Sequence, residues 1–108
     1  MTTLRSFPRS GNLETIGPAL LYVNVSWCSH CKKTRPIMEQ VSGMLGRTVP
    51  VYSIDGDERT DLVAALAVDG FPTIVYVDGG GGKHKYTGDR TANAITNGIQ
   101  RMRKAGYT

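Results

Sequence analysis

The stretch ALLYVNVSWCSHCK, residues 19–32, decides the fold of this chain. Its first half, Ala19–Val25, is a short apolar run rich in β-forming residues, which predicts a buried strand. Its second half opens the segment Ser26–Arg47, where apolar residues recur with the spacing of one helix face. Cys28 and Cys31 therefore fall where a buried strand passes into a helix.

Outward from this stretch, strand and helix patterns alternate. Downstream we expect a strand at Val49–Ile54, a helix at Thr60–Ala67, a strand at Thr73–Val77, a hairpin turn at Asp78–Gly82, an edge strand at Lys83–Thr87 and a helix at Thr91–Lys104. Residues 1–18 are expected to be irregular, with an edge strand near Leu4–Phe7 and a helical turn opened by Asn12 or Glu14. The prediction is one α/β domain over residues 1–108, a mixed sheet of four to five strands with helices on both faces.

Length and composition exclude several classes of protein. The chain has 108 residues, of which 40% are hydrophobic, and a net charge of +4. This composition is globular and excludes a disordered chain, a collagen-like repeat and a coiled coil. No apolar run approaches the ~18 residues of a transmembrane helix, so no membrane partner is expected. The basic residues lie in short runs without interleaved aromatic residues, which predicts solvated helix faces and no nucleic-acid partner.

The ends of the chain carry no recognisable targeting signal, which predicts a cytoplasmic location. In a reducing compartment, two cysteines close in sequence are more often catalytic or metal-binding than structural. A zinc site needs about four ligands, and His30 and His84 are the only histidines that could complete one. Because His30 is expected to point away from a shared centre, we predict no metal.

The spacing of the cysteine pair is typical of thiol–disulfide exchange. At a helix N-terminus, free backbone N–H groups and the helix dipole favour the thiolate of Cys28, which is the nucleophilic form. Cys31, one turn further and more buried, can attack a mixed disulfide on Cys28 and release the substrate. His30 either stabilises the thiolate, which makes the disulfide a better oxidant, or is an exposed residue without a role. Trp27 either packs in the core or faces the substrate.

These residues carry a resemblance to a known family. The motif WCSHCK at 27–32, then Pro36, the segment GFPT at 70–73 and Gly88, resembles the thioredoxin superfamily from about Ala19 to Met102. Within it, the chain looks most similar to a single catalytic domain of protein disulfide isomerase. His30 before the second cysteine and the segment YTGDRT at 86–91 carry that closer likeness.

The resemblance implies roles for further residues. Pro72 is expected to be cis, beside the cysteines, and Phe71 to offer its backbone to an extended substrate. Arg90 is expected to approach Cys31 and lower the pKa of its thiol. The same resemblance implies protein thiols and disulfides as substrates, a reductase or glutathione as recycling partner, no cofactor beyond the cysteine pair, and a monomer. The substrate groove would be lined by Trp27, Gly70 and Gly88.

Two positions depart from the family pattern. The family buries an acid six residues before the first cysteine, where this chain has Tyr22, and pairs it with a lysine where this chain has Ser53. The two charges are absent together, as expected, because either one alone would be a buried unpaired charge. Without the acid we expect slower proton transfer from Cys31.

The function predicted from the sequence is a thiol–disulfide oxidoreductase or isomerase. His30 favours an oxidant, whereas a cytosolic address favours a reductant, so the direction of exchange stays open. An alternative is a non-catalytic binding or scaffold module with the same fold, which the missing charge pair would fit. Glutaredoxin-like glutathione binding is a weaker alternative, because Trp27 and Phe71 follow the thioredoxin pattern.

Overall fold

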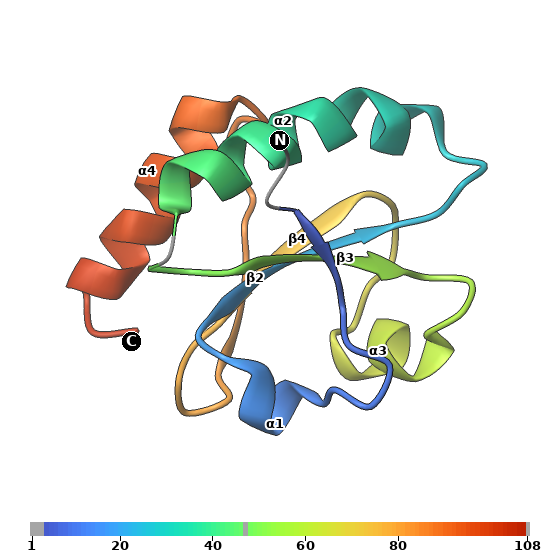
Figure 1. The fold of residues 1–108 in the computed structure, drawn as a ribbon, viewed down its shortest axis with the longest axis horizontal. Helices are drawn as coiled ribbons and strands as arrows, with labels where there is room; N and C mark the ends of the chain where they lie inside the picture. Colours follow the sequence, from blue (N-terminus) through green and yellow to red (C-terminus); the bar gives the residue numbers. More distant parts are fainter. Residues whose placement is uncertain (1–3, 47, 108) are drawn as a thin grey trace.

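The computed structural model describes residues 4–46 and 48–107 and places them in a single sheet flanked by helices (Figure 1). In chain order the elements are β1 (Arg5–Ser6), α1 (Leu13–Ile16), β2 (Ala19–Asn24), α2 (Ser29–Leu45), β3 (Val51–Asp55), α3 (Thr60–Ala65), β4 (Thr73–Val77), β5 (Lys83–Lys85) and α4 (Ala92–Lys104). The sheet order is β1-β3-β2-β4-β5. The predicted α/β fold with a mixed sheet is confirmed.

Strand β2 lies at the centre of the sheet and leads directly into the cysteine turn. It is parallel to β3 and antiparallel to β4, in a register that sets Tyr22 beside Ser53 on one side and Ile74 on the other. The first five residues of β2 are buried, because helices cover both faces of the sheet. The strand therefore holds the start of α2 at a fixed position.

The two faces of the sheet carry separate hydrophobic clusters. Helices α2 and α4 cover one face, and α1 and α3 cover the other (Figure 1). The first cluster contains Tyr22 and Tyr76 from the sheet, together with Met38 of α2 and Ile95 of α4. A third, small cluster joins the two cysteines to Val25, with Phe71 packed against it. No helix within residues 4–46 and 48–107 has both the length and the apolar character needed to cross a membrane.

Local backbone chemistry shortens the predicted central elements. The helix expected from Ser26 begins at Ser29, because Cys28 has extended backbone angles and caps it. It ends at Leu45, before Gly46 with a φ of 61°. Its predicted end at residue 47 lies outside the described residues. The strand expected from Val49 begins at Val51, after Pro50, which has no N–H to donate to a ladder.

The remaining boundaries shift by a few residues. Helix α3 ends before the left-handed Ala67, at a φ of 53°. The ladder between β4 and β5 ends at the pair of Val75 and Lys85, so β5 stops short of the predicted Thr87. The side-chain oxygens of Asn12 and Thr91 cap α1 and α4, and β1 is shorter than the predicted edge strand.

Candidate active site

Cys28 is the N-cap of α2, and its sulfur is the focus of the site. The sulfur accepts the backbone N–H of Cys31 at 3.1 Å, and its thiol donates to the carbonyl of Phe71 at 3.7 Å. Both cysteines are free thiols in this structure. Cys28 is 9% exposed and Cys31 is 3% exposed, so the second sulfur lies deeper, as the helix geometry predicts. Cys28 is thus the more accessible of two buried thiols, and Cys31 lies behind it.

The surroundings of the two sulfurs push their acidities in opposite directions. The hydrogen bond from the Cys31 thiol lowers the pKa of Cys28, and the backbone N–H groups of Cys31 and His30 and the charge of Arg90 act in the same direction. Burial raises the pKa of Cys31 to about 11, helped by the hydrogen bond that its thiol makes to Cys28. Near neutral pH, Cys28 is therefore the better nucleophile of the pair.

His30 and Arg90 act on this pair by different routes. His30 is exposed, and its ring has no polar contact among the described residues, whereas its backbone N–H points to the Cys28 sulfur. A role for the imidazole stays a prediction. Arg90, in the loop before α4, donates to the carbonyl of Pro72 at 3.3 Å. Its positive charge lowers the pKa of both cysteine thiols, in the direction the resemblance implies.

A surface of aromatic and proline residues borders the cysteines. The Phe71–Pro72 peptide bond is cis, as predicted, and the Phe71 carbonyl contacts Cys28. Trp27 is 69% exposed, which excludes a place in the core. Its ring meets Phe71 edge-on at 5.9 Å between centroids, and its Nε1 donates to Asp57 at 3.1 Å. Trp27, Phe71 and Pro72 thus lie together beside the nucleophilic sulfur.

The glycines assigned to the groove have different surroundings. Gly70 is exposed, and its carbonyl accepts the hydroxyl of Thr73 at 2.6 Å. Gly88 lines a hollow beside α4 together with Gly98 and Met102, and no described contact joins it to the cysteines. A role for Gly88 in the groove therefore stays a prediction without support from a contact.

Sequence reasoning missed two residues that support the groove. A Cβ at Gly56 would lie 2.8 Å from the Phe71 ring, so this glycine lets the ring sit close to the sheet. Asp57, the next residue, holds the Trp27 indole. Both follow β3, which runs parallel to β2, so their loop and the cysteines lie beyond the carboxyl ends of two neighbouring strands. That shared position is the signal that could have identified them.

Neutral hydrogen bonds replace the charged pair that the family keeps beneath the second cysteine. Tyr22 is fully buried, and its hydroxyl donates to the carbonyl of Cys31 at 2.5 Å. Burial raises the pKa of this phenol well above its ordinary value. Ser53 accepts the side-chain N–H of Asn24 at 2.8 Å. No ionisable acid therefore stands at either of these two positions.

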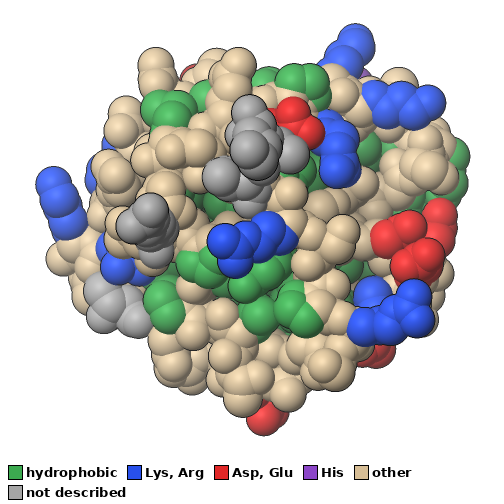
Figure 2. Space-filling view, viewed as in Figure 1, with side chains coloured by type: hydrophobic (Ala, Val, Ile, Leu, Met, Phe, Trp, Pro, Cys, Tyr) green, Lys and Arg blue, Asp and Glu red, His purple; other side chains and the backbone are tan. Residues whose placement is uncertain are grey.

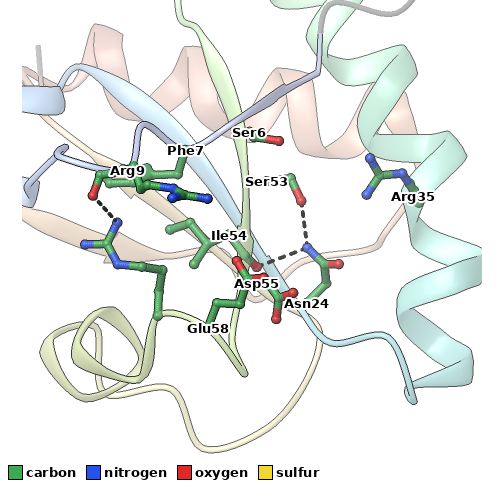
Figure 3. Close-up of a pocket in the computed structure, with 10 residues that line it drawn as sticks. Ser6, Phe7, Arg9, Asn24, Arg35, Ser53, Ile54, Asp55 and Glu58 are labelled. Atoms are coloured by element: carbon green, nitrogen blue, oxygen red, sulfur yellow. Dashed lines mark hydrogen bonds between the residues drawn. The ribbon is translucent and has the colours of Figure 1, made fainter.

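Asn24 and Ser53 line a polar cavity of about 490 Å³ (Figure 3). Arg35 reaches toward the same cavity from α2, Asp55 lines it from the end of β3, and Glu58 lines it from the loop that follows. The lining carries both charge signs, and neither cysteine belongs to it. The cavity therefore adjoins the site without being part of it.

Charged side chains are dispersed over the face seen in Figure 2. The basic run after the cysteines, formed by Lys32, Lys33 and Arg35, is exposed on α2, as the sequence predicts. Within the described part of the chain, no three His, Cys, Asp or Glu side chains gather as metal ligands would.

Comparisons with known proteins agree with this geometry. The thioredoxin family profile matches residues 11–101. Over 91 residues the chain is 33% identical to protein disulfide-isomerase tigA of Aspergillus niger, an alignment covering 81% of this chain and 25% of that protein. It is 32% identical over 60 residues to the thioredoxin of Borreliella burgdorferi, covering 56% of this chain and 51% of that protein.

A solved structure gives the same result in three dimensions. The first thioredoxin domain of mouse protein disulfide-isomerase A4 superposes with a TM-score of 0.74 at 28% identity, covering 83% of this chain and 66% of that chain. The chain spans a quarter of the length of the Aspergillus isomerase and about half of the Borreliella thioredoxin. The match thus concerns one domain of the isomerases.

Proposed function

Because this chain belongs to the thioredoxin family, we propose that it is a thiol–disulfide oxidoreductase that exchanges disulfides with protein cysteines through Cys28 and Cys31. The observation that carries the proposal is the placement of the two thiols: Cys28 caps α2 and accepts the N–H of Cys31 at 3.1 Å, and Cys31 lies deeper, at 3% exposed. The acidities of the two thiols agree with this order. The pKa of Cys28 is lowered by donors around its sulfur, whereas the pKa of Cys31 is raised by burial to about 11. Cys28 is therefore the thiol that attacks the substrate, and Cys31 remains protonated until the mixed disulfide has formed.

The reaction proceeds in two exchanges that balance without a cofactor. The Cys28 thiolate attacks one sulfur of a substrate disulfide, forms a mixed disulfide and releases the other substrate sulfur as a thiolate, which takes a proton from water. Cys31 then gives its proton to solvent and attacks the Cys28 sulfur. The mixed disulfide breaks, the second substrate thiolate leaves, and the Cys28–Cys31 disulfide remains. The substrate gains two electrons, and the protein loses two.

The cis-proline surface supports protein substrates. Phe71 has its carbonyl beside the Cys28 thiol, and the exposed Trp27 ring stands next to it. An extended chain laid along this surface would pair with backbone groups while its disulfide reaches the nucleophile. The recycling partner would be a reductase or glutathione, acting on the Cys28 sulfur.

Trapping of a substrate tests the proposal. Reduced protein with Cys31→Ser should retain a disulfide-bonded protein substrate on Cys28, because nothing resolves the mixed disulfide. Cys28→Ser should retain none and should not reduce a protein disulfide at all. Thr34→Ser serves as the matched control, because it changes a buried residue of α2 and keeps the hydroxyl that donates to the carbonyl of His30. Equal trapping by both cysteine variants would contradict the assigned order of attack.

The reduction potential of the pair decides the direction of exchange. A potential near the ~−180 mV of protein disulfide isomerase would make the protein a disulfide donor or shuffler, as His30 favours. A potential near the ~−270 mV of thioredoxin would make it a reductant, which suits a cytoplasmic location. Equilibration with glutathione buffers, followed by thiol labelling and mass measurement, gives the value.

One observation favours a second candidate, a non-catalytic binding module. Tyr22 and Ser53 leave no ionisable acid–lysine pair beneath Cys31. Loss of that pair would matter little to a protein that uses only its groove to bind partners. A variant with both cysteines replaced by serine separates the two candidates, because a binding module would keep its partner affinity and its cellular role.

A further inference from the structure

The hydroxyl of Tyr22 contacts α2 next to a gap in its backbone hydrogen bonds. Pro36 lies inside α2 and has no N–H to donate to the carbonyl of Lys32, one turn earlier. The first turn of α2 therefore lacks part of the backbone ladder that holds an ordinary helix together. Just before this gap, the Tyr22 hydroxyl donates to the carbonyl of Cys31 at 2.5 Å from the fully buried floor of the site.

This bond leaves Cys31 fixed at both ends of its backbone. Its N–H donates to the Cys28 sulfur at 3.1 Å, and its C=O accepts the hydroxyl of Tyr22. Tyr22 itself lies in the middle strand, between β3 and β4, and packs in the core cluster with Met38 of α2. The hydroxyl of Tyr22 thus ties the second cysteine directly to the buried central strand of the sheet.

Resting on the proposed function, we propose that Tyr22 is a positioning residue: its hydroxyl, bonded to the Cys31 carbonyl, holds Cys31 in place to stabilise the Cys28 thiolate and to attack the mixed disulfide. The phenol replaces the family's buried acid in space but has a different use. The Tyr22 hydroxyl donates its proton to the Cys31 carbonyl, so Tyr22 acts on the cysteines through the helix backbone. The proton of the Cys31 thiol is released to solvent. The titratable groups that face it are Cys28, Cys31, Arg35 of α2 and Arg90 of the loop before α4.

Tyr76 supplies a matched control within the same core. It is also fully buried and belongs to the same cluster, and its hydroxyl donates to the carbonyl of Tyr107 at 2.7 Å, away from the cysteines. Tyr22→Phe and Tyr76→Phe each remove one hydroxyl and one hydrogen bond to a backbone carbonyl, and Tyr76→Phe also removes the acceptor of a hydrogen bond from Arg103 at 3.3 Å. Both variants keep the aromatic ring, so both should fold, with the larger loss of stability expected for Tyr76→Phe.

The experiment follows the two thiol releases from a chromogenic aromatic disulfide added to the reduced protein. The first release reports attack by Cys28, and the second reports attack by Cys31 on the mixed disulfide. Tyr22→Phe should slow the second release about fivefold, the equivalent of one lost hydrogen bond. Tyr76→Phe should leave it unchanged. Equal rates in the two variants, whether both are slowed or both unaffected, would overturn the proposal.

A second readout separates this proposal from the proposed function. The pH midpoint of Cys28 alkylation needs no disulfide substrate, and it should move upward in Tyr22→Phe but not in Tyr76→Phe. If the wild-type protein released no second thiol, the proposed function would fail, and an unshifted midpoint would then overturn the role of Tyr22 as well.

The Pro36→Ala variant tests the argument from the helix ladder, because it restores a backbone N–H to α2. In this background, the effect of Tyr22→Phe on the rate of the second thiol release should shrink by at least half. An undiminished effect would contradict the argument from the helix ladder.

Discussion

Tyr22 and Tyr76 stand on neighbouring strands, in the same core cluster, and each donates its hydroxyl to a backbone carbonyl. Tyr22 reaches the cysteine turn at the start of α2, whereas Tyr76 reaches Tyr107 near the end of the chain. These two regions lie at opposite ends of the molecule in Figure 1. At one end the bond holds a reactive turn, and at the other it holds a terminal segment.

The difference between the ends lies in what surrounds each bond. Around Tyr22 stand two thiols and the positive charges of Arg35 and Arg90. At the other end, Asp78 accepts His84 at 2.8 Å, and the His84 ring packs on Tyr107 at 4.2 Å between centroids. The same kind of bond from a buried tyrosine hydroxyl can therefore position a reactive group or hold a terminal segment. The residues around its acceptor decide which.

The largest expected effect is a pH dependence of the rate of the second thiol release, which involves only the cysteine end of the molecule. A thiol attacks as its thiolate, and well below a pKa of about 11 the thiolate fraction of Cys31 grows tenfold per pH unit. Burial, the largest cause of that shift, does not depend on the Cys28 thiol, whereas the hydrogen bond and the charge of Cys28 are lost in the mixed disulfide. The second thiol release should therefore rise by at least about tenfold between pH 7 and 9. Attack by Cys28, whose pKa is lowered, should level off earlier, and stopped-flow absorbance would measure both; a flat second step would contradict the assignment.

The next effect restores the acid that this chain lacks. Tyr22→Glu places a base beneath Cys31 and should speed the second thiol release about tenfold over Tyr22→Phe, a modest share of what general bases contribute. A carboxyl group buried without a partner costs stability, so Tyr22→Glu with Ser53→Lys should unfold at a higher denaturant concentration than Tyr22→Glu alone. Unchanged release rates in Tyr22→Glu would show that proton transfer does not limit this protein.

Two glycines allow a matched steric test of the two ends. A Cβ at Gly56 would lie 2.8 Å from the ring of Phe71, and one at Gly98 would lie 2.8 Å from the ring of Tyr86. Gly56→Ala should cost about 1–3 kcal/mol of unfolding free energy through overpacking and should slow reduction of protein disulfides. Gly98→Ala should be milder, because alanine gains about 1 kcal/mol in a helix, and should leave that reduction unchanged. Urea unfolding and a turnover assay on both variants would settle the contrast.

The smallest effect belongs to the end without the cysteines. Tyr107 is 45% exposed, and its ring packs on His84. Tyr107→Ala should lower the free energy of unfolding by about 1 kcal/mol, the order of an aromatic pair, since its carbonyl still accepts Tyr76. Alkylation of Cys28 should keep its wild-type rate. A changed alkylation rate would mean that the two ends are coupled through the sheet.

Sequence patterns were sufficient wherever one residue type decides the local structure. Cys28 at the start of a helix and the segment before Pro72 follow from spacing and from the family motif. The helix ends moved because Cys28 caps α2 with its own sulfur and Ala67 adopts a left-handed conformation. Hydrophobic spacing does not reveal either feature.

Contacts made across the sheet could not be read from the sequence. The target of the Tyr22 hydroxyl depends on the angle between β2 and α2, and the bond from Trp27 to Asp57 joins residues 30 positions apart. The absence of the family's acid and lysine was visible at Tyr22 and Ser53. The bonds that replace them required the register of β2 with β3.

Trp27 is the only tryptophan of the chain. Its indole is 69% exposed, is held by Asp57, and directly precedes the nucleophilic cysteine. Tryptophan emission therefore reports the surroundings of this one ring beside Cys28. In the proposed exchange, oxidation of the cysteine pair, docking of a peptide and release of a product would each change those surroundings, so each step can be followed by tryptophan fluorescence without attaching a dye.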